Sequence, residues 1–254
     1  MSPRAATPPL PGDLEAGLKR LKLSTIRRQA PEVLLTAKTQ RWAPEETLRV
    51  LIDLEIASRD ASNTRNRMTA ARFPVVKTFD EFNLAESSIP RASHDYLVTL
   101  DWIAKADNVC LVGPAGTGKT HYLIALGRAA VQAGHKVRYF TAIELVEHLY
   151  RAVADNTVGR AIEAMCRNEL IIIDEVGFAP LDHTGCQLMF RLVAAAYERR
   201  SVAIASHSPF EAWGRFLPDQ PTAVSLLDRL CHHAHIITTT GDSYRLTHRT
   251  TGGA

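Results

Sequence analysis

Apolar residues near the start of the chain recur every three to four positions, the spacing of one helix face. Between residues 14 and 28 they alternate with basic residues, which predicts an amphipathic helix. A second helix is predicted from Pro44, running towards Arg67, because proline suits a first helical turn. Glu45 and Glu46 also suit the positive end of the helix dipole. The front of the chain is therefore expected to be helical.

From residue 108 onward, short apolar runs alternate with longer stretches of helical character. The expected strands are 108–112, 137–141, 170–174 and 201–206, and the expected helices are 119–133, 142–168 and 184–199. Such alternation predicts an α/β fold, with a parallel sheet covered by helices on both faces. Before it, an irregular stretch at 79–82 leads into one amphipathic helix that ends near Trp102.

Charge divides the chain in a similar place. Residues 1–77 carry 14 Lys and Arg against 8 Asp and Glu, whereas residues 78–254 carry 16 against 19. A basic front and a mildly acidic back favour two modules, the first being the better partner for a polyanion. We expect a disordered leader over 1–12, a helical basic domain over 13–77 and a catalytic domain over 78–248.

Composition excludes several classes of protein. A hydrophobic content of 46% argues against general disorder, and no apolar stretch is long enough to span a membrane. The first ten residues lack the apolar core of a secretory signal. The four cysteines stand far apart with no C-x-x-C pair, which is typical of reduced thiols in the cytoplasm.

A phosphate-binding motif follows the first expected strand. The residues fit G-x-x-x-x-G-K-[ST] and lie between a strand and a helix, as this motif requires. Backbone N–H groups of such a loop surround phosphates, while the lysine reaches the β- and γ-phosphates and the Thr hydroxyl ligates Mg²⁺. The motif therefore predicts ATP and Mg²⁺ as ligands of Gly113, Pro114, Ala115, Gly116, Thr117, Gly118, Lys119, Thr120 and the adjoining His121.

Two carboxylates end the apolar strand at 170–174. Carboxyl ends of parallel strands form the ligand-binding edge of an α/β sheet. Asp174 is expected to hold Mg²⁺, and Glu175 to polarise the attacking water. The adjacent Glu favours ATP hydrolysis over transfer to a small-molecule hydroxyl, as in a kinase built on the same loop.

Three further residues are candidates for the same reaction. His207 follows the strand at 201–206, where it either orients water beside the γ-phosphate or, with Ser206, caps the next helix. Arg229 is a candidate arginine finger for a neighbouring subunit, or a surface arginine on an amphipathic helix. Arg245 has the same two interpretations.

Histidines gather in the run 231–235, Cys-His-His-Ala-His. A zinc site needs ligands that converge, and the sequence offers no second cluster of Cys or His with supporting spacing. The run therefore favours a mixture of buried and exposed histidines over a metal site.

The basic residues of the front have two interpretations. They form either a solvated helix face or a surface that neutralises DNA phosphates and releases counterions. The candidates for DNA contact are Lys19, Arg20, Arg59, Arg65, Arg67, Arg72 and Lys77.

Together these segments resemble the IstB-type transposition helper ATPases. The likeness covers residues 14–246 and rests on GPAGTGKTH (113–121), LIIIDEVGFAPLD (170–182), YERRSVAIASHSPFEAWG (197–214), LLDRLCHHAHII (226–237) and GDSYRL (241–246), with LKRLKLSTIRR (18–28) and RMTAARFPVVKTFDEF (67–82) in front. The DnaC-type helicase loaders share the ATPase core but are a more distant match.

The resemblance implies a P-loop AAA+ core without a C-terminal helical lid, preceded by a small all-α domain. It implies a bacterial, ATP-dependent homo-oligomer that binds double-stranded DNA largely without sequence preference and assists a transposase. Arg229 matches the family's inter-subunit finger, and Arg245 matches a residue that senses nucleotide. His207 stands where the family usually has Asn, which leaves the water-orienting role open because imidazole can carry charge. The alternative function is that of a helicase loader.

Overall fold

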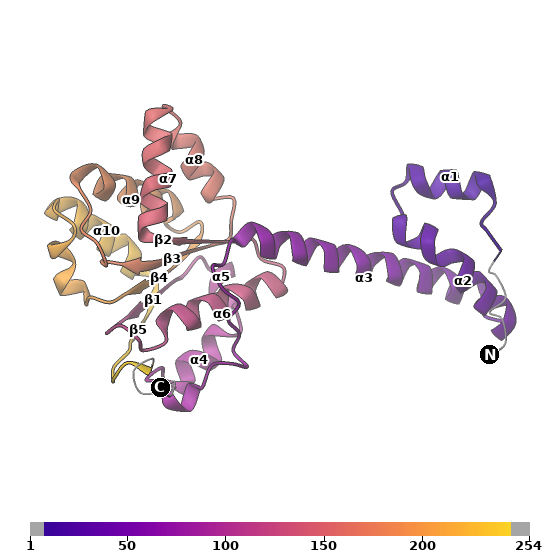
Figure 1. Ribbon diagram of the computed structural model, residues 1–254, viewed down its shortest axis with the longest axis horizontal. Coiled ribbons are helices and arrows are strands. Elements are labelled where there is room, and N and C mark those ends of the chain that lie inside the picture. Colours follow the sequence, from indigo (N-terminus) through magenta and orange to yellow (C-terminus); the bar gives the residue numbers. More distant parts are fainter. Residues whose placement is uncertain (1–7, 245–254) are drawn as a thin grey trace, which may run out of the picture. The chain divides into compact units, whose positions relative to one another are not determined.

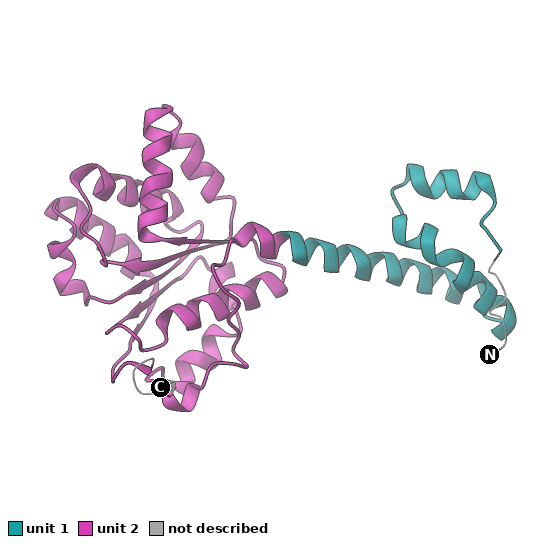
Figure 2. Cartoon of the chain, in the orientation of Figure 1, with its two compact units in different colours: residues 1–66 teal, residues 67–254 magenta. Residues whose placement is uncertain are grey.

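The computed structural model describes residues 8–244, which form two compact units (Figures 1 and 2). Unit 1 is Met1–Asn66 and unit 2 is Arg67–Ala254. The division falls inside the helix α3 (Pro44–Ala71), whereas the expected boundary was residue 77. Part of the expected leader lies outside the described residues. Among those described, no helix is long and apolar enough to cross a membrane.

Unit 1 contains α1 (Gly12–Arg20), α2 (Ser24–Gln40) and the first part of α3. The single helix expected over 14–28 is wrong, because the chain breaks at Lys22, whose φ of 57° is left-handed. The Leu23 N–H donates to the Leu18 carbonyl across this break at 2.9 Å, which closes α1 before α2 begins. The periodicity of the apolar residues continues through the break and therefore conceals it.

The start of α2 is stabilised by a residue from α3. The N–H groups of Thr25 and Ile26 donate to Glu55 Oε2 at 2.9 and 3.0 Å, and Arg59 Nε donates to Glu55 Oε1 at 2.9 Å. Burial alone would raise the pKa of Glu55, but these backbone donors and the Arg59 guanidinium hold it below its usual range. The carboxylate thus satisfies helix donors that the flanking Leu23 leaves without a side-chain cap.

Replacing Glu55 with alanine is expected to destabilise α2 by about 3 kcal/mol, because two N–H groups lose a charged acceptor. Hydrogen exchange at the α2 amides measures this change. The control is Glu45→Ala, which removes an exposed carboxylate from α3, the helix that also carries Glu55. Because the pKa is lowered on folding, the stabilisation is present above the unfolded pKa and lost as pH falls through the folded pKa. Equal amide protection in the two variants would contradict the assignment.

A parallel five-stranded sheet forms the centre of unit 2. Its strands are β1 (Asn108–Val112), β2 (Val137–Thr141), β3 (Leu170–Val176), β4 (Ser201–Ser206) and β5 (Ala234–Thr238). They lie in the order β2-β3-β4-β1-β5, and every pairing is parallel. The four expected strands are confirmed. The strand β5, which pairs with β1 along its whole length, was not expected.

Helices cover both faces of this sheet, as Figure 1 shows. Ile171 and Ile173 of β3 belong to one apolar core and Leu170 and Ile172 to the other, which is the alternation of a strand buried on two sides. The helices that contribute to the first core are α7 (Ala142–Ala154), α8 (Val158–Met165), α9 (His183–Ala196) and α10 (Gln220–His232). Those that contribute to the second core are α4 (Arg91–Leu97), α5 (Asp101–Ala104) and α6 (Lys119–Gln132). Two short 3₁₀ helices are Leu84–Glu86 and Phe210–Arg215.

The expected α/β class is therefore confirmed, with one further correction. The helix expected to end near Trp102 is broken by Leu100, which has a left-handed φ of 64°. It forms α4 and α5 instead, and Trp102 becomes one of the largest fully buried side chains. Because all strands are parallel, their carboxyl ends meet at one edge, where the candidate site lies.

Candidate nucleotide-binding site

The loop after β1, residues 113–118, is called the phosphate loop here. Its glycines have left-handed φ values of 152° at Gly113, 85° at Gly116 and 88° at Gly118. A Cβ at Gly113 would overlap the Thr239 carbonyl, and one at Gly116 would overlap the Ser243 hydroxyl. The backbone conformation and the neighbouring chain segment thus both require glycine at positions 113 and 116. With this conformation the loop can present its N–H groups to an anion.

Lys119 begins α6 and is 8% exposed. Its ammonium donates to the carbonyls of Gly113 and Pro114 at 2.6 and 2.5 Å, and to Thr117 Oγ1 at 3.3 Å. Thr117 Oγ1 also lies 2.7 Å from Thr239 Oγ1. The lysine is thereby held inside the loop at a helix N-terminus, where positive charge and free N–H groups favour phosphate.

The candidate Mg²⁺ ligands come from α6 and β3. Thr120 lies in the first turn of α6, directly after Lys119, and Asp174 is 2% exposed. Asp174 Oδ2 accepts from the Tyr139 hydroxyl at 2.8 Å, and Oδ1 accepts from the Glu175 N–H at 2.8 Å. Burial and then the Asp174 charge raise the pKa of Tyr139, which keeps the phenol protonated as a donor. A buried carboxylate oriented in this way fits a divalent cation that prefers oxygen ligands.

Glu175 occupies an irregular position of β3. Its φ is 58°, and the register between β3 and β4 shifts between Ile173 and Val176. The side chain is exposed while both neighbours, Asp174 and Val176, are buried. A bulge of this kind turns one side chain out of the strand pattern, and strained backbone is common at catalytic positions. Glu175 is therefore available to a water molecule while Asp174 stays buried.

The tip of β4 lies beside the phosphate loop. Ser206 pairs with Val112, and its carbonyl accepts from the Gly113 N–H at 3.1 Å. Ser206 Oγ donates to the Ser208 carbonyl at 2.8 Å, while His207 is exposed with its ring 6.2 Å from that of Phe178. The residue flanking the next helix is Pro209, so the capping interpretation of Ser206 or His207 is wrong.

The segment 78–82 packs behind the phosphate loop and was not among the expected site residues. His121 Nε2 lies 2.9 Å from the Thr78 carbonyl, and its ring contacts Phe82 edge-on at 5.2 Å. A Cβ at Gly118 would lie 3.0 Å from the Phe82 ring. The His121 side chain thus holds the 78–82 stretch against the loop, and nucleotide contact by His121 stays a prediction.

Of the two arginine candidates, only Arg229 lies within the described residues. Arg229 lies on α10, where Nη1 donates to the Ser225 carbonyl at 3.0 Å and the guanidinium lies 5.1 Å from the centre of the Phe190 ring. These contacts are within its own subunit, and the role of inter-subunit finger stays a prediction. Arg245 lies outside the described residues, whereas Tyr244 donates its N–H to the Gly116 carbonyl at 3.1 Å.

The parallel sheet, the glycine loop with Lys119 and the buried Asp174 define a P-loop ATPase of the AAA+ class. The family of IstB-like ATP binding proteins matches residues 16–252. The chain belongs to that family, a group of ATP-binding proteins associated with IS21-type transposition.

Relatives that are named as proteins of insertion sequences support this membership. The ATP-binding protein of insertion sequence IS21 from Pseudomonas aeruginosa is 33% identical, over 95% of this chain and 91% of the relative. That of IS5376 from Geobacillus stearothermophilus is 31% identical, over 89% of this chain and 91% of the relative.

Solved structures share the fold at lower identity. DnaA from Aquifex aeolicus, solved with AMPPCP, is 19% identical with a TM-score of 0.53, covering 65% of this chain and 50% of that one. A crystal structure of DnaI is 16% identical with a TM-score of 0.51, covering 65% of this chain and 91% of that one.

Proposed function

We propose that the chain is an ATP-dependent, DNA-binding oligomer that prepares target DNA for a transposase. The observation that carries the proposal is the meeting of the phosphate loop, Asp174 and Glu175 at one edge of the sheet, in a chain whose relatives belong to insertion sequences. ATP would be held by the loop, and the catalytic domain would extend over 78–248.

The nucleotide chemistry follows from the placement of these residues. Lys119 and the loop N–H groups would hold the phosphates, and Mg²⁺, held by Thr120 and Asp174, would supply charge neutralisation. Glu175 would accept a proton from water, because its side chain is exposed next to buried Asp174. His207, which follows Ser206 at the tip of β4, would orient that water.

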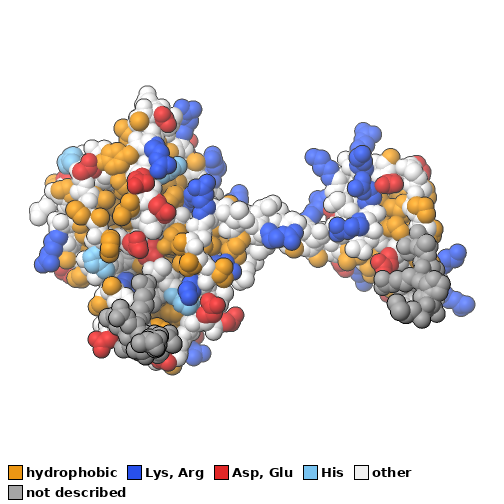
Figure 3. Space-filling model, in the orientation of Figure 1, with side chains coloured by type: hydrophobic (Ala, Val, Ile, Leu, Met, Phe, Trp, Pro, Cys, Tyr) orange, Lys and Arg blue, Asp and Glu red, His pale blue; other side chains and the backbone are white. Residues whose placement is uncertain are grey.

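Basic side chains on both units support DNA binding. Lys and Arg are spread over the visible face of unit 1, as Figure 3 shows. Of the candidates, Arg59 is partly engaged, because its Nη2 donates to the Lys22 carbonyl at 2.9 Å in addition to its Glu55 pair. The exposed candidates are Lys19, Arg20, Arg59, Arg65 and Arg72, and the half-buried ones are Arg67 and Lys77.

In unit 2, Arg72, one of the expected DNA contacts, belongs to a cationic cluster whose other members were not among the candidates. The pKa of Arg138 is lowered by burial and then by the Arg72 charge, while the Glu144 carboxylate opposes this shift. The pKa of His148 is lowered by burial and then by Arg138 and Arg151. A DNA phosphate placed there would relieve this mutual repulsion, which favours backbone contact without base readout.

Oligomerisation on DNA would raise the overall affinity, because once one subunit is bound, the weak contacts of its neighbours form at a high effective concentration. Arg229 would serve the neighbouring subunit's ATP after releasing its own Phe190 contact. A helicase loader is the alternative, because the sequence also resembles, more distantly, the DnaC-type helicase loaders. Co-purification with a hexameric helicase, without DNA binding by the purified chain, would favour the loader.

The test is the ATPase rate with and without duplex DNA at low and moderate salt. We expect stimulation by DNA that fades as salt rises, because release of condensed counterions drives phosphate binding. Arg72→Ala and Arg138→Ala should weaken DNA binding about uniformly across sequences and lower its salt dependence. A chain that stays monomeric with ATP and duplex DNA present would refute the proposal.

A further inference from the structure

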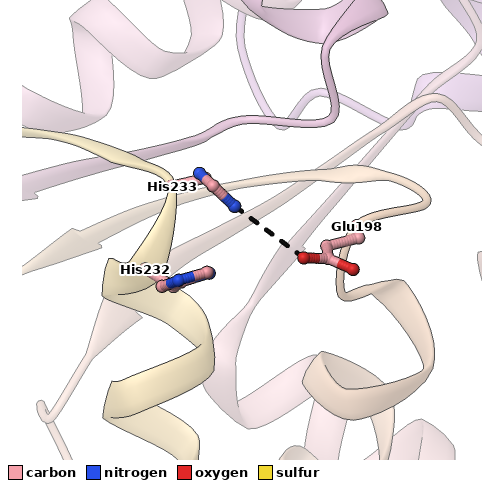
Figure 4. Close-up of side chains that lie close together, drawn as sticks. All are labelled: Glu198, His232 and His233. Carbon is pink, nitrogen blue, oxygen red and sulfur yellow. Dashed lines mark ion pairs between the residues drawn. The ribbon is translucent and has the colours of Figure 1, made fainter.

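Two of the histidines in the run 231–235 meet an acidic side chain from a distant part of the chain. His232 ends α10, His233 follows it, and Glu198 lies in the turn between α9 and β4 (Figure 4). One ligand atom from each of these three side chains lies within 4.8 Å of the other two. His233 Nε2 is 3.8 Å from Glu198 Oε1. The structure thus supplies the convergence that the sequence did not show.

From this geometry we infer a binding site for a zinc ion, with Glu198, His232 and His233 as its ligands. Two imidazoles and one carboxylate form a donor set that zinc accepts, with water completing the tetrahedron. Ligands of one zinc ion lie about 3.3 Å apart, given zinc–nitrogen distances near 2.0–2.1 Å. All three side chains are exposed, so rotamer changes can close the remaining gap at little cost.

A neighbouring tyrosine orients one of the two imidazoles. The Tyr197 hydroxyl lies 2.8 Å from His232 Nδ1, which leaves Nε2 of that ring for the metal when Nδ1 donates the proton. Such a partner fixes ring orientation and tautomer, as carboxylate or carbonyl groups do around many metal-bound histidines. Tyr197 is therefore a positioning residue for the zinc site.

The ion would join two elements that are distant in sequence. Glu198 lies just beyond the carboxyl end of α9, and His232 lies at the carboxyl end of α10. These helices already touch through the Arg229 guanidinium over Phe190. Zinc would tie the end of α10 to the α9–β4 turn, one helical turn from Arg229. This binding property is independent of the proposed reaction with ATP.

Zinc titration of the untagged chain without nucleotide tests the proposal. Competition with a chromophoric chelator should show one ion per chain whose affinity falls at least about tenfold in His232→Ala, His233→Ala and Glu198→Gln. Tyr197→Phe should weaken binding less than loss of a ligand. Zinc at about a hundred times its dissociation constant should also raise the melting temperature of the unchanged chain by about 5 °C, but not that of His232→Ala.

His235→Ala is the matched control, because it removes a histidine of the same run whose Nε2 lies 3.6 Å from Asp107 and outside the cluster. It should keep the zinc ion. Melting temperatures measured in EDTA should agree for all variants, which separates lost binding from lost folding. Equal zinc affinity in the unchanged chain and in a His232→Ala, His233→Ala double variant would overturn the site, as would an unchanged chain that binds no zinc.

Discussion

Lys119→Ala is expected to abolish ATP binding at working concentrations, with affinity falling at least about a hundredfold. The ammonium lies inside the phosphate loop, where hydrogen bonds to charged groups contribute about 1.5–3 kcal/mol each. Alanine removes the charge that would neutralise the phosphates and leaves the carbonyls of Gly113 and Pro114 without this donor. Equilibrium binding of a fluorescent ATP analogue measures the loss.

Exposed Lys136→Ala is the control for Lys119→Ala, because it removes the same charge away from the loop. We expect it to bind ATP normally and to assemble on duplex DNA with ATP. Lys119→Ala should fail to assemble, as sedimentation with a labelled duplex would show. ATP-dependent assembly by Lys119→Ala would contradict the proposed role of the nucleotide.

Glu175→Gln is expected to lower ATP turnover about 10²- to 10⁴-fold while ATP binding survives. The amide keeps the size of the side chain and can occupy the same bulge, but it cannot take a proton from water. ATP-bound assemblies should then persist on DNA instead of dissociating. Single-turnover hydrolysis and the lifetime of the DNA complex measure the two effects.

The control for Glu175→Gln is Glu163→Gln, which neutralises an exposed carboxylate on α8. That variant should turn over ATP at the rate of the unchanged chain. Full turnover by Glu175→Gln would remove Glu175 from the catalytic role and direct attention to His207.

Strands buried on both faces could be predicted from the sequence because they are continuous apolar runs. The segment 170–174 is such a run, and its end placed Asp174 and Glu175 at the correct edge of the sheet. β5 escaped because its sequence, Ala-His-Ile-Ile-Thr, is only partly buried and begins in a run of histidines. Such a strand lacks the continuous apolar run that marks a buried strand, and its partner β1 is distant in sequence.

Other features escaped because they depend on long-range contacts. Glu55 supports the start of α2 from about thirty residues away, and neither helix has a local signal for that pair. Arg59 belonged to a basic run, yet its guanidinium is shared with Glu55 and the Lys22 carbonyl. The phosphate motif fixed the identity of the loop residues, but the motif carries no information on what packs behind them.

The chain segment after β5 forms a wall of the phosphate loop. Thr239 faces Gly113 and Thr117, and Ser243 and Tyr244 face Gly116. A substitution at Thr239, Ser243 or Tyr244 is therefore expected to act on nucleotide binding, although none of these residues belongs to the motif.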